Sequence, residues 1–272
     1  MTRHLNKDTI VCMSLAARPS NFGTRFHNFL YDALDLDYLY KAFTTTDLAA
    51  AIGGVRALGI RGCAISMPFK EACIPMVDEL DPSAKAIDSV NTIVNTNGYL
   101  KAYNTDYIAI AKLLAEHQVS NQLTFALRGS GGMAKAVACA LKDAGFKNGY
   151  IVARNEAAGK QLAGLYGFGW AADMAGIQAE LLINVTPIGM AGGAESETLA
   201  FTEEAIEQAQ VIFDVVALPP ETPLIRCARA KGKKVITGAE VFAIQAVEQF
   251  VLYTGIRPGD ELFQQAAKYA RG

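Results

Sequence analysis

The order of apolar and polar positions predicts a chain of alternating strands and helices. Short apolar runs are typical of strands, and apolar residues spaced three or four apart indicate helices that bury one face. An Asn-Gly pair at 97–98 separates two of the strands and is a signal for a hairpin turn. In the first part of the chain, strands are predicted at 9–15, 38–42, 62–66, 89–94 and 99–102, and helices at 24–34, 46–58 and 69–80.

The second part alternates more regularly, which is typical of a parallel, doubly wound sheet. The run 211–216 is nearly continuous in apolar residues, as expected for a central strand covered on both faces. We therefore expect an α/β protein of two domains. The predicted strands of the second part are 123–127, 150–153, 181–184, 211–216 and 234–237, and the helices are 107–117, 133–144, 156–166, 203–208, 222–231, 241–253 and 260–269.

The stretch from 124 to 154 contains a strand, a glycine turn, a helix and a second strand. This is the order of a dinucleotide-binding unit, with the glycine pattern in its G-x-G-x-x-A form. Gly129 allows the tight turn, Gly131 leaves room for a pyrophosphate, and Ala134 lets the helix pack closely on the strand. The helix start offers unpaired N–H groups to phosphates. A glycine turn without a ligand is the alternative, and the flanking elements argue against it. The predicted cofactor contacts here are Gly129, Ser130, Gly131, Gly132, Met133 and Ala134.

The end of the second strand indicates which dinucleotide binds. An NAD site usually carries an acidic residue about 20 residues after the glycines, where it binds the ribose hydroxyls. That position holds Arg154, followed by Asn155. A planar guanidinium suits a 2′-phosphate. The sequence therefore predicts a Rossmann-type domain that binds NADP rather than NAD.

Length and charge narrow the classes of function. With 272 residues and half of them apolar, the chain is long enough for about two domains. The net charge of −2 and the lack of a basic run argue against nucleic acid and membrane surfaces as partners. No signal segment or membrane span is visible, so we expect a cytoplasmic protein. The five cysteines and three histidines are scattered, which predicts no metal site and no disulfides.

Two ionisable residues suggest acid–base chemistry. Lys70 follows a predicted strand and a proline turn, and Asp106 lies where the two predicted domains meet. An alcohol that loses hydride must also lose a proton, and a neutral lysine amine can accept it. A nearby carboxylate would hold the lysine and the substrate hydroxyl in place. The alternative for each residue alone is a solvated surface charge.

Seven motifs then occur in one order along nearly the whole chain, and together they resemble shikimate dehydrogenase, more closely its shikimate dehydrogenase-like subfamily. The motifs are SMPFK (66–70), SVNT (89–92), YNTD (103–106), GSGGMAKA (129–136), NVTPIGM (184–190), FDVVALPPETPLI (213–225) and the helix containing Gly238 and Gln245.

The resemblance implies a reversible, NADP-linked oxidation of shikimate to 3-dehydroshikimate, a step of aromatic amino acid biosynthesis. It implies a substrate-binding catalytic domain formed by 1–105 and 241–272, and an NADP-binding domain at 106–240, in a monomer or homodimer. Lys70 matches the catalytic lysine and Asp106 its partner. By the same matching, Asn91 and Gln245 hold substrate, Arg154 binds the 2′-phosphate, and Thr186, Met190 and Gly238 lie beside the nicotinamide.

The chain departs from the family on the substrate side. The family's Ser-x-Ser pair, which binds the substrate carboxylate, aligns with Asn21 and Gly23, so Ser20 and Asn21 are the replacements that we predict. Ser66 keeps one hydroxyl of the usual Asn-Val-Thr, and Ala217 replaces a common tyrosine. We therefore expect weak activity on shikimate, or a preference for quinate or an aminated analogue. A regulator that binds NADP without turnover is the alternative from another class.

Overall fold

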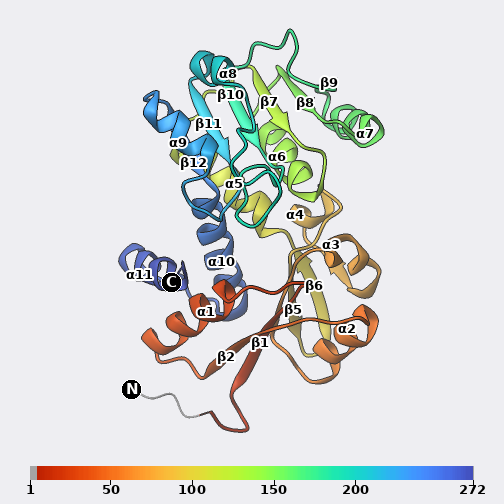
Figure 1. Cartoon of the computed structure of the whole chain (residues 1–272). Coiled ribbons are helices and arrows are strands. Elements are labelled where there is room, and N and C mark those ends of the chain that lie inside the picture. The colour runs from red at the N-terminus through yellow and green to blue at the C-terminus, as the bar shows by residue number, and fades with distance from the viewer. Residues whose placement is uncertain (1–4, 272) are drawn as a thin grey trace. The chain divides into compact units, whose positions relative to one another are not determined.

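The computed structural model describes residues 5–271, and these form two compact units (Figure 1). One unit runs to Thr105 and resumes at Ala243, and the other spans Asp106–Phe242. Each unit has a six-stranded sheet with helices. The α/β fold with two domains, predicted from the alternation of strands and helices, is therefore confirmed. The sequence predicts that the chain returns to the first domain at 241, and the compact unit resumes two residues later, at Ala243.

The first unit is built on a mixed sheet of order β2-β1-β3-β5-β6-β4. The strands β1, β2 and β3 are parallel, and β5 and β6 form an antiparallel hairpin. Asn97 and Gly98 both have positive φ, as the predicted tight hairpin turn requires. The strands are β1 (Ile10–Leu15), β2 (Tyr38–Phe43), β3 (Gly62–Ile65), β4 (Glu79–Leu80), β5 (Thr92–Thr96) and β6 (Tyr99–Tyr103).

Side chains alternate between the two faces of this sheet and enter two separate apolar clusters. Cys12 and Tyr40 pack with one cluster, and Met13 and Leu15 with the other. The first cluster includes α1, α11 and the later part of α10, and the second includes α2. The helices of this unit are α1 (Phe22–Ala33), α2 (Leu48–Ala57), α3 (Phe69–Ala72), α4 (Pro82–Lys85), α11 (Asp260–Arg271) and the last two-thirds of α10 (Gly238–Thr254).

The predicted helix at 69–80 is wrong in its length. The α-helix ends at Ala72, a short 3₁₀ turn follows at Ile74–Met76, and Glu79–Leu80 joins the sheet as β4. Pro75 accounts for the early end, because it lacks a backbone N–H and disfavours helical conformation in the residue before it. Two short elements, α4 and β9 (Gly169–Ala171), were not predicted, since neither is long enough to show a period.

His27 lies fully buried in an aromatic part of the first core. Its ring stacks on Tyr40 at 4.3 Å between centroids and meets the Phe26 ring edge-on. Neither ring nitrogen makes a hydrogen bond of ordinary geometry with another described residue. Burial lowers the pKa of His27 to about 3, against a smaller opposing effect of Gln249. The folded protein therefore keeps this imidazole neutral.

We expect His27 to make the fold sensitive to acid. Between pH 6.5 and about 3 the unfolded chain binds a proton at this residue and the folded chain does not, so the free energy of unfolding falls as the pH drops through this window. From pH 7 to pH 5 the loss at this residue is about 2 kcal/mol. Urea unfolding of the wild type and of His27→Phe at both pH values measures it. An equal loss of unfolding free energy in both proteins would contradict the assignment of this acid sensitivity to His27.

The second unit has an all-parallel sheet of order β12-β11-β10-β7-β8-β9, the Rossmann-type arrangement that the glycine motif predicts. Ala126, Leu182 and Ile212 face α8 and α9 in one apolar cluster, and α6 and α7 pack beside one another. The strands are β7 (Phe125–Arg128), β8 (Gly149–Val152), β9, β10 (Leu181–Asn184), β11 (Val211–Asp214) and β12 (Lys234–Thr237). The helices are α5 (Thr105–Glu116), α6 (Gly132–Asp143), α7 (Glu156–Tyr166), α8 (Glu203–Gln208), α9 (Pro223–Ala230) and the first turn of α10.

Candidate functional site

The glycine turn between β7 and α6 has the geometry that its sequence predicts. Gly129 has a φ of +126°, and a Cβ there would lie 2.7 Å from Val185 Cγ2, so only glycine fits. Gly131 is the N-cap of α6 and has open space where a side chain would be. The first turn of α6 carries no acidic residue and no side-chain cap. Its N–H groups and the positive end of the helix dipole therefore face a space that suits a phosphate.

Arg154 follows β8 and is exposed. It forms no ion pair or hydrogen bond with any residue that the structure describes, so its guanidinium is available to an anion. Asn155 caps α7 by accepting the Ala158 N–H at 3.1 Å, which leaves its amide N–H groups for another partner. Ser130, Gly132 and Met133 are half-buried around the turn, and Ala134 is fully buried against the sheet.

The carboxyl ends of the parallel strands form one row across the sheet. Arg128, Asn184, Asp214 and Thr237 are successive partners in register, so four polar residues lie side by side at this edge. Ligands of doubly wound sheets bind outside this edge. The predicted cofactor residues of the second unit therefore share the edge with these four residues, none of which the sequence analysis predicts as a site residue.

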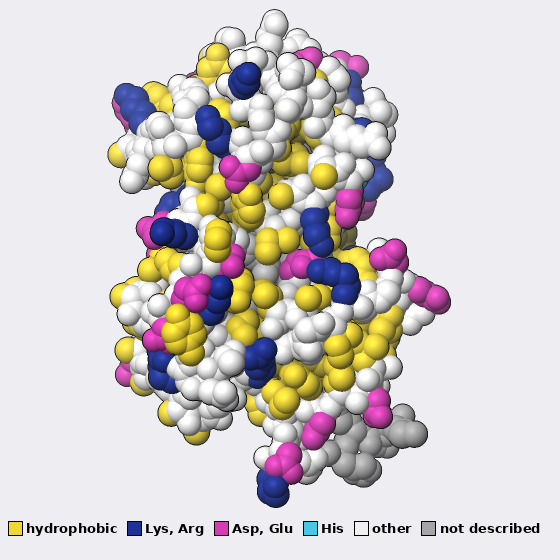
Figure 2. All heavy atoms as spheres, turned by 180° about the vertical axis from the view of Figure 1, so that it is seen from behind, with side chains coloured by type: hydrophobic (Ala, Val, Ile, Leu, Met, Phe, Trp, Pro, Cys, Tyr) yellow, Lys and Arg dark blue, Asp and Glu magenta, His cyan; other side chains and the backbone are white. Residues whose placement is uncertain are grey.

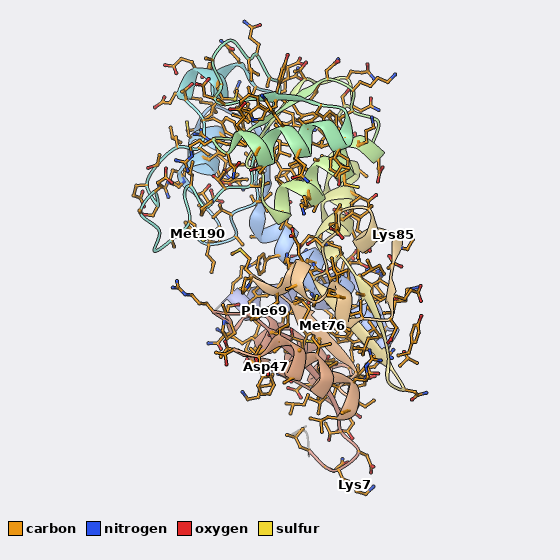
Figure 3. All side chains as sticks on the ribbon, turned by 90° about the vertical axis from the view of Figure 1, so that its right-hand side faces the viewer. Lys7, Asp47, Phe69, Met76, Lys85 and Met190 are labelled. Carbon is orange, nitrogen blue, oxygen red and sulfur yellow. The ribbon has the colours of Figure 1, made fainter. Side chains whose placement is uncertain are left out.

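Asn184 and Asp214 hold the loops at this edge by a buried network. Asn184 Nδ2 donates to Asp214 Oδ1 at 3.0 Å and to the Ile188 carbonyl, and Asn184 Oδ1 accepts from Thr186 Oγ1 at 2.6 Å. Thr222 Oγ1 donates to Asp214 Oδ2 at 2.6 Å. Thr186 is thus fixed at the start of the loop between β10 and α8, on which Met190 is exposed (Figure 3).

Asp214 changes the pH dependence of the free energy of unfolding in the opposite direction to His27. Burial raises the pKa of Asp214 from 3.8 to about 6, although three hydrogen-bond donors favour its charged form. The stability that this residue contributes is full below pH 3.8 and is lost as the pH rises through about 6. Wild type and His27→Phe both carry Asp214. Its contribution to the pH-dependent change in the free energy of unfolding therefore cancels when the two proteins are compared.

Gly238 lies where α10 begins, against the backbone of the segment after β11. A Cβ at Gly238 would lie 2.3 Å from the Val216 carbonyl oxygen. Backbone atoms cannot move aside as a flexible side chain can, so the position requires glycine. Glycine here brings the start of α10 close to the chain that follows Asp214, at the same edge of the sheet.

In the first unit, the predicted substrate residues lie on loops from one edge of its sheet. The strands β1 and β3 are parallel and end together, with Leu15 opposite Ile65. The Ser66 N–H bonds the Leu15 carbonyl and the Ala17 N–H bonds the Met67 carbonyl, so the loops after the two strands are joined. Ser20 and Asn21 follow on the first loop and are exposed, and Ser66 follows on the second loop, which leads to Lys70 in α3.

Asn91 connects this edge to the end of β6. Its Oδ1 accepts the Thr105 N–H at 2.8 Å and the Thr92 hydroxyl at 2.8 Å, and its Nδ2 bonds Thr105 Oγ1 at 3.0 Å. The Val90 N–H donates to the Lys70 carbonyl at 2.9 Å. Asn91 therefore fixes the backbone directly before Asp106, and its neighbour Val90 fixes the backbone of Lys70. The Asp106 side chain is buried and Lys70 is half-exposed.

Gln249 is a residue that the sequence reading missed. Its Nε2 donates to Thr92 Oγ1 at 3.0 Å and to the Asn91 carbonyl at 3.3 Å, and its side chain is buried. Gln245, one turn earlier on α10, is half-exposed and keeps its amide for another partner. The four-residue spacing puts both on one face of the helix, which is the signal that could have identified Gln249.

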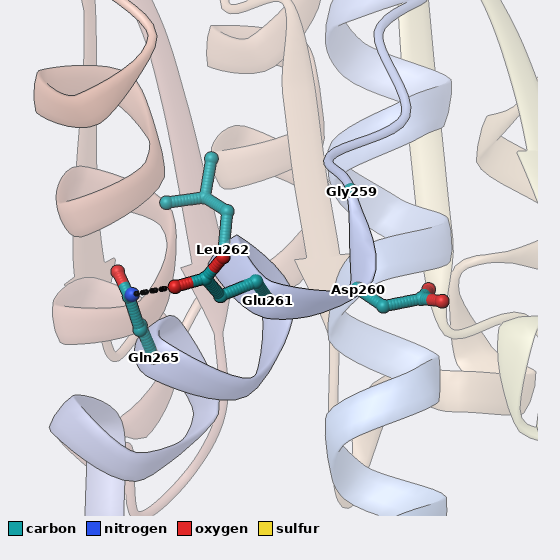
Figure 4. A pocket seen from close by; sticks show the side chains of 5 residues that line it. All are labelled: Gly259, Asp260, Glu261, Leu262 and Gln265. Carbon is teal, nitrogen blue, oxygen red and sulfur yellow. Dashed lines mark hydrogen bonds between the residues drawn. The ribbon is translucent and has the colours of Figure 1, made fainter.

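No cluster of residues in 5–271 could hold a metal ion, and no helix in that range is long and apolar enough to cross a membrane. On the face that Figure 2 shows, Lys and Arg side chains are scattered rather than gathered in a patch. A hollow at the start of α11 (Figure 4) is lined by Asp260 and Glu261, whose charges would repel an anion, and Glu261 accepts a hydrogen bond from Gln265.

Comparison with known proteins assigns the family. The model of the shikimate dehydrogenase substrate-binding domain matches residues 22–93. A shikimate dehydrogenase-like protein of Haemophilus influenzae is 59% identical over 98% of both chains. A solved shikimate 5-dehydrogenase-like structure has a TM-score of 0.96 and 58% identity, covering 99% of this chain and 100% of the other. Shikimate 5-dehydrogenase from Thermus thermophilus, solved with NADP(H) and shikimate, has a TM-score of 0.86 at 28% identity, covering 96% and 99%. The chain belongs to the shikimate dehydrogenase family.

Proposed function

We propose that the protein is an NADP-dependent dehydrogenase that interconverts shikimate, or a close relative of shikimate, with its 3-dehydro form. The observation that carries the proposal is the arrangement at one edge of the first unit's sheet. There Asn91 fixes the backbone before Asp106, and Val90, the residue directly before Asn91, fixes the backbone of Lys70. The Thermus thermophilus relative, which binds NADP(H) and shikimate, supports the same cofactor and substrate class.

The residues around the glycine turn fit a phosphorylated dinucleotide. Uncapped N–H groups at the start of α6 would bind the pyrophosphate, and the unpaired Arg154 would bind the 2′-phosphate. Thr186, Met190 and Gly238 would line the nicotinamide end. When bound, the cofactor supplies the acceptor for the hydride that the alcohol carbon loses.

Residues of the first unit, with Asp106 directly after Thr105 in the chain, would position the alcohol and remove its proton. Lys70 Nζ would accept the hydroxyl proton as the carbon is oxidised, and would return it in the reverse direction. Asp106 would orient Lys70 and the hydroxyl. Asn91 has one amide N–H left after its bond to Thr105, and this N–H and the Gln245 amide would bind the other ring hydroxyls.

The loop after β1 favours a modified carboxylate site. At position 23, in the first turn of α1 after this loop, a Cβ would lie 3.3 Å from the Tyr40 ring, so a serine there would require a small shift of the ring. Ser20 and Asn21 remain exposed beside it as the polar groups available to a carboxylate. Each neutral hydrogen bond lost in such a change weakens binding by about 0.5–1.5 kcal/mol. We therefore propose weak activity on shikimate itself, with quinate or an aminated analogue as the alternative substrates.

A substrate panel tests the proposed function. Purified protein is mixed with NADP⁺ and shikimate, quinate or an aminated analogue, and NADPH formation is followed by absorbance. Turnover on at least one member is expected. Binding of NADP⁺ by calorimetry without turnover on any member would contradict the dehydrogenase and favour a nucleotide-binding regulator.

Replacing Arg154 with alanine tests the cofactor assignment. A charge-assisted hydrogen bond contributes about 1.5–3 kcal/mol, so the KM for NADP⁺ should rise roughly 10- to 100-fold. The KM for NAD⁺ should change little, because NAD⁺ has no phosphate at that position. Arg229→Ala is a matched control, since Arg229 is exposed and pairs with Glu221 in the same unit. An unchanged KM for NADP⁺ in Arg154→Ala would show that this assignment is wrong.

A further inference from the structure

Arg128 is a half-buried cation at the end of β7, directly before the glycine turn. Its Nη1 donates to the Ala200 carbonyl, and its guanidinium carbon lies 5.9 Å from the centre of the Phe201 ring. No acidic side chain of the described chain forms an ion pair with it. A charge that is partly removed from water without a counter-charge costs free energy.

The sheet places Arg128 near Arg154. The residue opposite Arg128 in the parallel register is Val152, and Arg154 follows two residues beyond, on the adjoining strand end. The Arg128 side chain lies over the Phe201 ring, and Phe201 and Val152 belong to one apolar cluster. Arg128 and Val152 therefore lie on the same side of the sheet. Burial, and next the positive charge of Arg154, lower the pKa of Arg128, and Glu195 opposes them. Two cations therefore repel one another at one end of the glycine turn.

We propose that Arg128 is a second specificity residue for the 2′-phosphate, so that the phosphate binds between the guanidinium groups of Arg128 and Arg154. This inference rests on the proposed function and goes beyond it in naming how NADP is preferred. A dianionic phosphate would replace the repulsion between the two arginines with two attractions. The 2′-hydroxyl of NAD carries no charge and would leave the repulsion in place.

The contact with Ala200 does not by itself require an arginine. A neutral amide could donate the same single hydrogen bond to that carbonyl, whereas a guanidinium has five N–H donors. Arg128→Gln therefore keeps a donor for the Ala200 carbonyl and removes the charge. Arg128→Lys keeps the charge and loses the planar fork.

The test is calorimetric titration of the full chain with NADP⁺ and NAD⁺, for wild type, Arg128→Gln, Arg128→Lys and Arg154→Gln. For Arg128→Gln we expect affinity for NADP⁺ to fall about tenfold or more and affinity for NAD⁺ to stay within about twofold. The affinity of Arg128→Lys for NADP⁺ should lie between the affinities of Arg128→Gln and wild type. Arg229→Gln, which removes one exposed charge of the same unit, should leave both affinities unchanged.

The outcomes separate this inference from the proposed function. If Arg154→Gln loses the preference for NADP⁺ and both Arg128 variants keep it, the inference is overturned and the proposed function stands. If Arg128→Gln and Arg128→Lys lose affinity equally for both dinucleotides, Arg128 has a structural role only, and the inference is also overturned. If the wild type binds neither dinucleotide, both fail. Should Arg128→Gln not fold, Arg128→Lys decides, because its preference for NADP⁺ must still fall.

Discussion

Replacing Lys70 with alanine is expected to lower turnover about 100- to 10,000-fold, because general-base proton transfer contributes that much to rate. The KM for substrate should change far less, since the proposed hydroxyl and carboxylate contacts of Asn91, Gln245 and the loop after β1 would remain. Steady-state rates with NADP⁺ and the best member of the substrate panel measure both quantities. The proposal for Lys70 fails if turnover in this variant matches that of the wild type.

Two further variants make the Lys70 experiment specific to proton transfer. Lys70→Arg keeps a positive charge but cannot release a proton at ordinary pH, so it should stay as slow as Lys70→Ala. Lys85→Ala removes an exposed lysine of the same unit, at the end of α4 (Figure 3), and should retain full turnover. A fast Lys70→Arg variant would assign Lys70 a purely electrostatic role.

Gly131→Ala is expected to weaken NADP⁺ binding about tenfold or more and leave the fold nearly intact. Nothing in the described chain lies within 4 Å of the added Cβ, and the φ of −84° is open to alanine. The N-cap change from glycine should cost less than about 1 kcal/mol. The methyl group would instead occupy the space through which the pyrophosphate approaches the backbone. Calorimetry with NADP⁺ and thermal unfolding measure the two effects.

Gly129→Ala is the matched comparison, two residues earlier in the same turn. Its φ of +126° and its 2.7 Å approach to Val185 Cγ2 mean that alanine strains the fold itself, by about 1–3 kcal/mol. Gly129→Ala should therefore lower both stability and NADP⁺ affinity, whereas Gly131→Ala lowers affinity alone. If Gly131→Ala bound NADP⁺ as tightly as wild type, the phosphate would not lie over this turn.

Elements defined by local pattern could be predicted from the sequence. The strand β10 and the helices α7 and α8 begin and end where the apolar period and the caps indicate, and Asn155 and Thr202 cap their helices as expected of such residues. The hairpin β5–β6 follows from Asn97-Gly98. In contrast, Pro75 divides a segment with an apparently helical pattern, and only its local backbone restriction ends α3 early.

The site residues that were missed depend on contacts between distant segments. Gln249 bonds Thr92 over a separation of 157 residues, and Asp214 meets Asn184 across two neighbouring strands. Arg128 has no motif of its own, since its importance comes from the register that places Val152 and then Arg154 beside it. Strand order and register determine these contacts, and one sequence read alone contains neither.

A crystal structure with NADP⁺ and the preferred panel substrate would show which groups lie against the reacting hydroxyl. The proposed function predicts Lys70 Nζ about 3 Å from the hydroxyl that is oxidised, which is the reach of a general base. It also predicts the Asp106 carboxylate beside the same hydroxyl, with the nicotinamide ring over the carbon and the pyrophosphate at the start of α6. A substrate bound with a different group against its reactive hydroxyl, or a nucleotide away from the glycine turn, would contradict it.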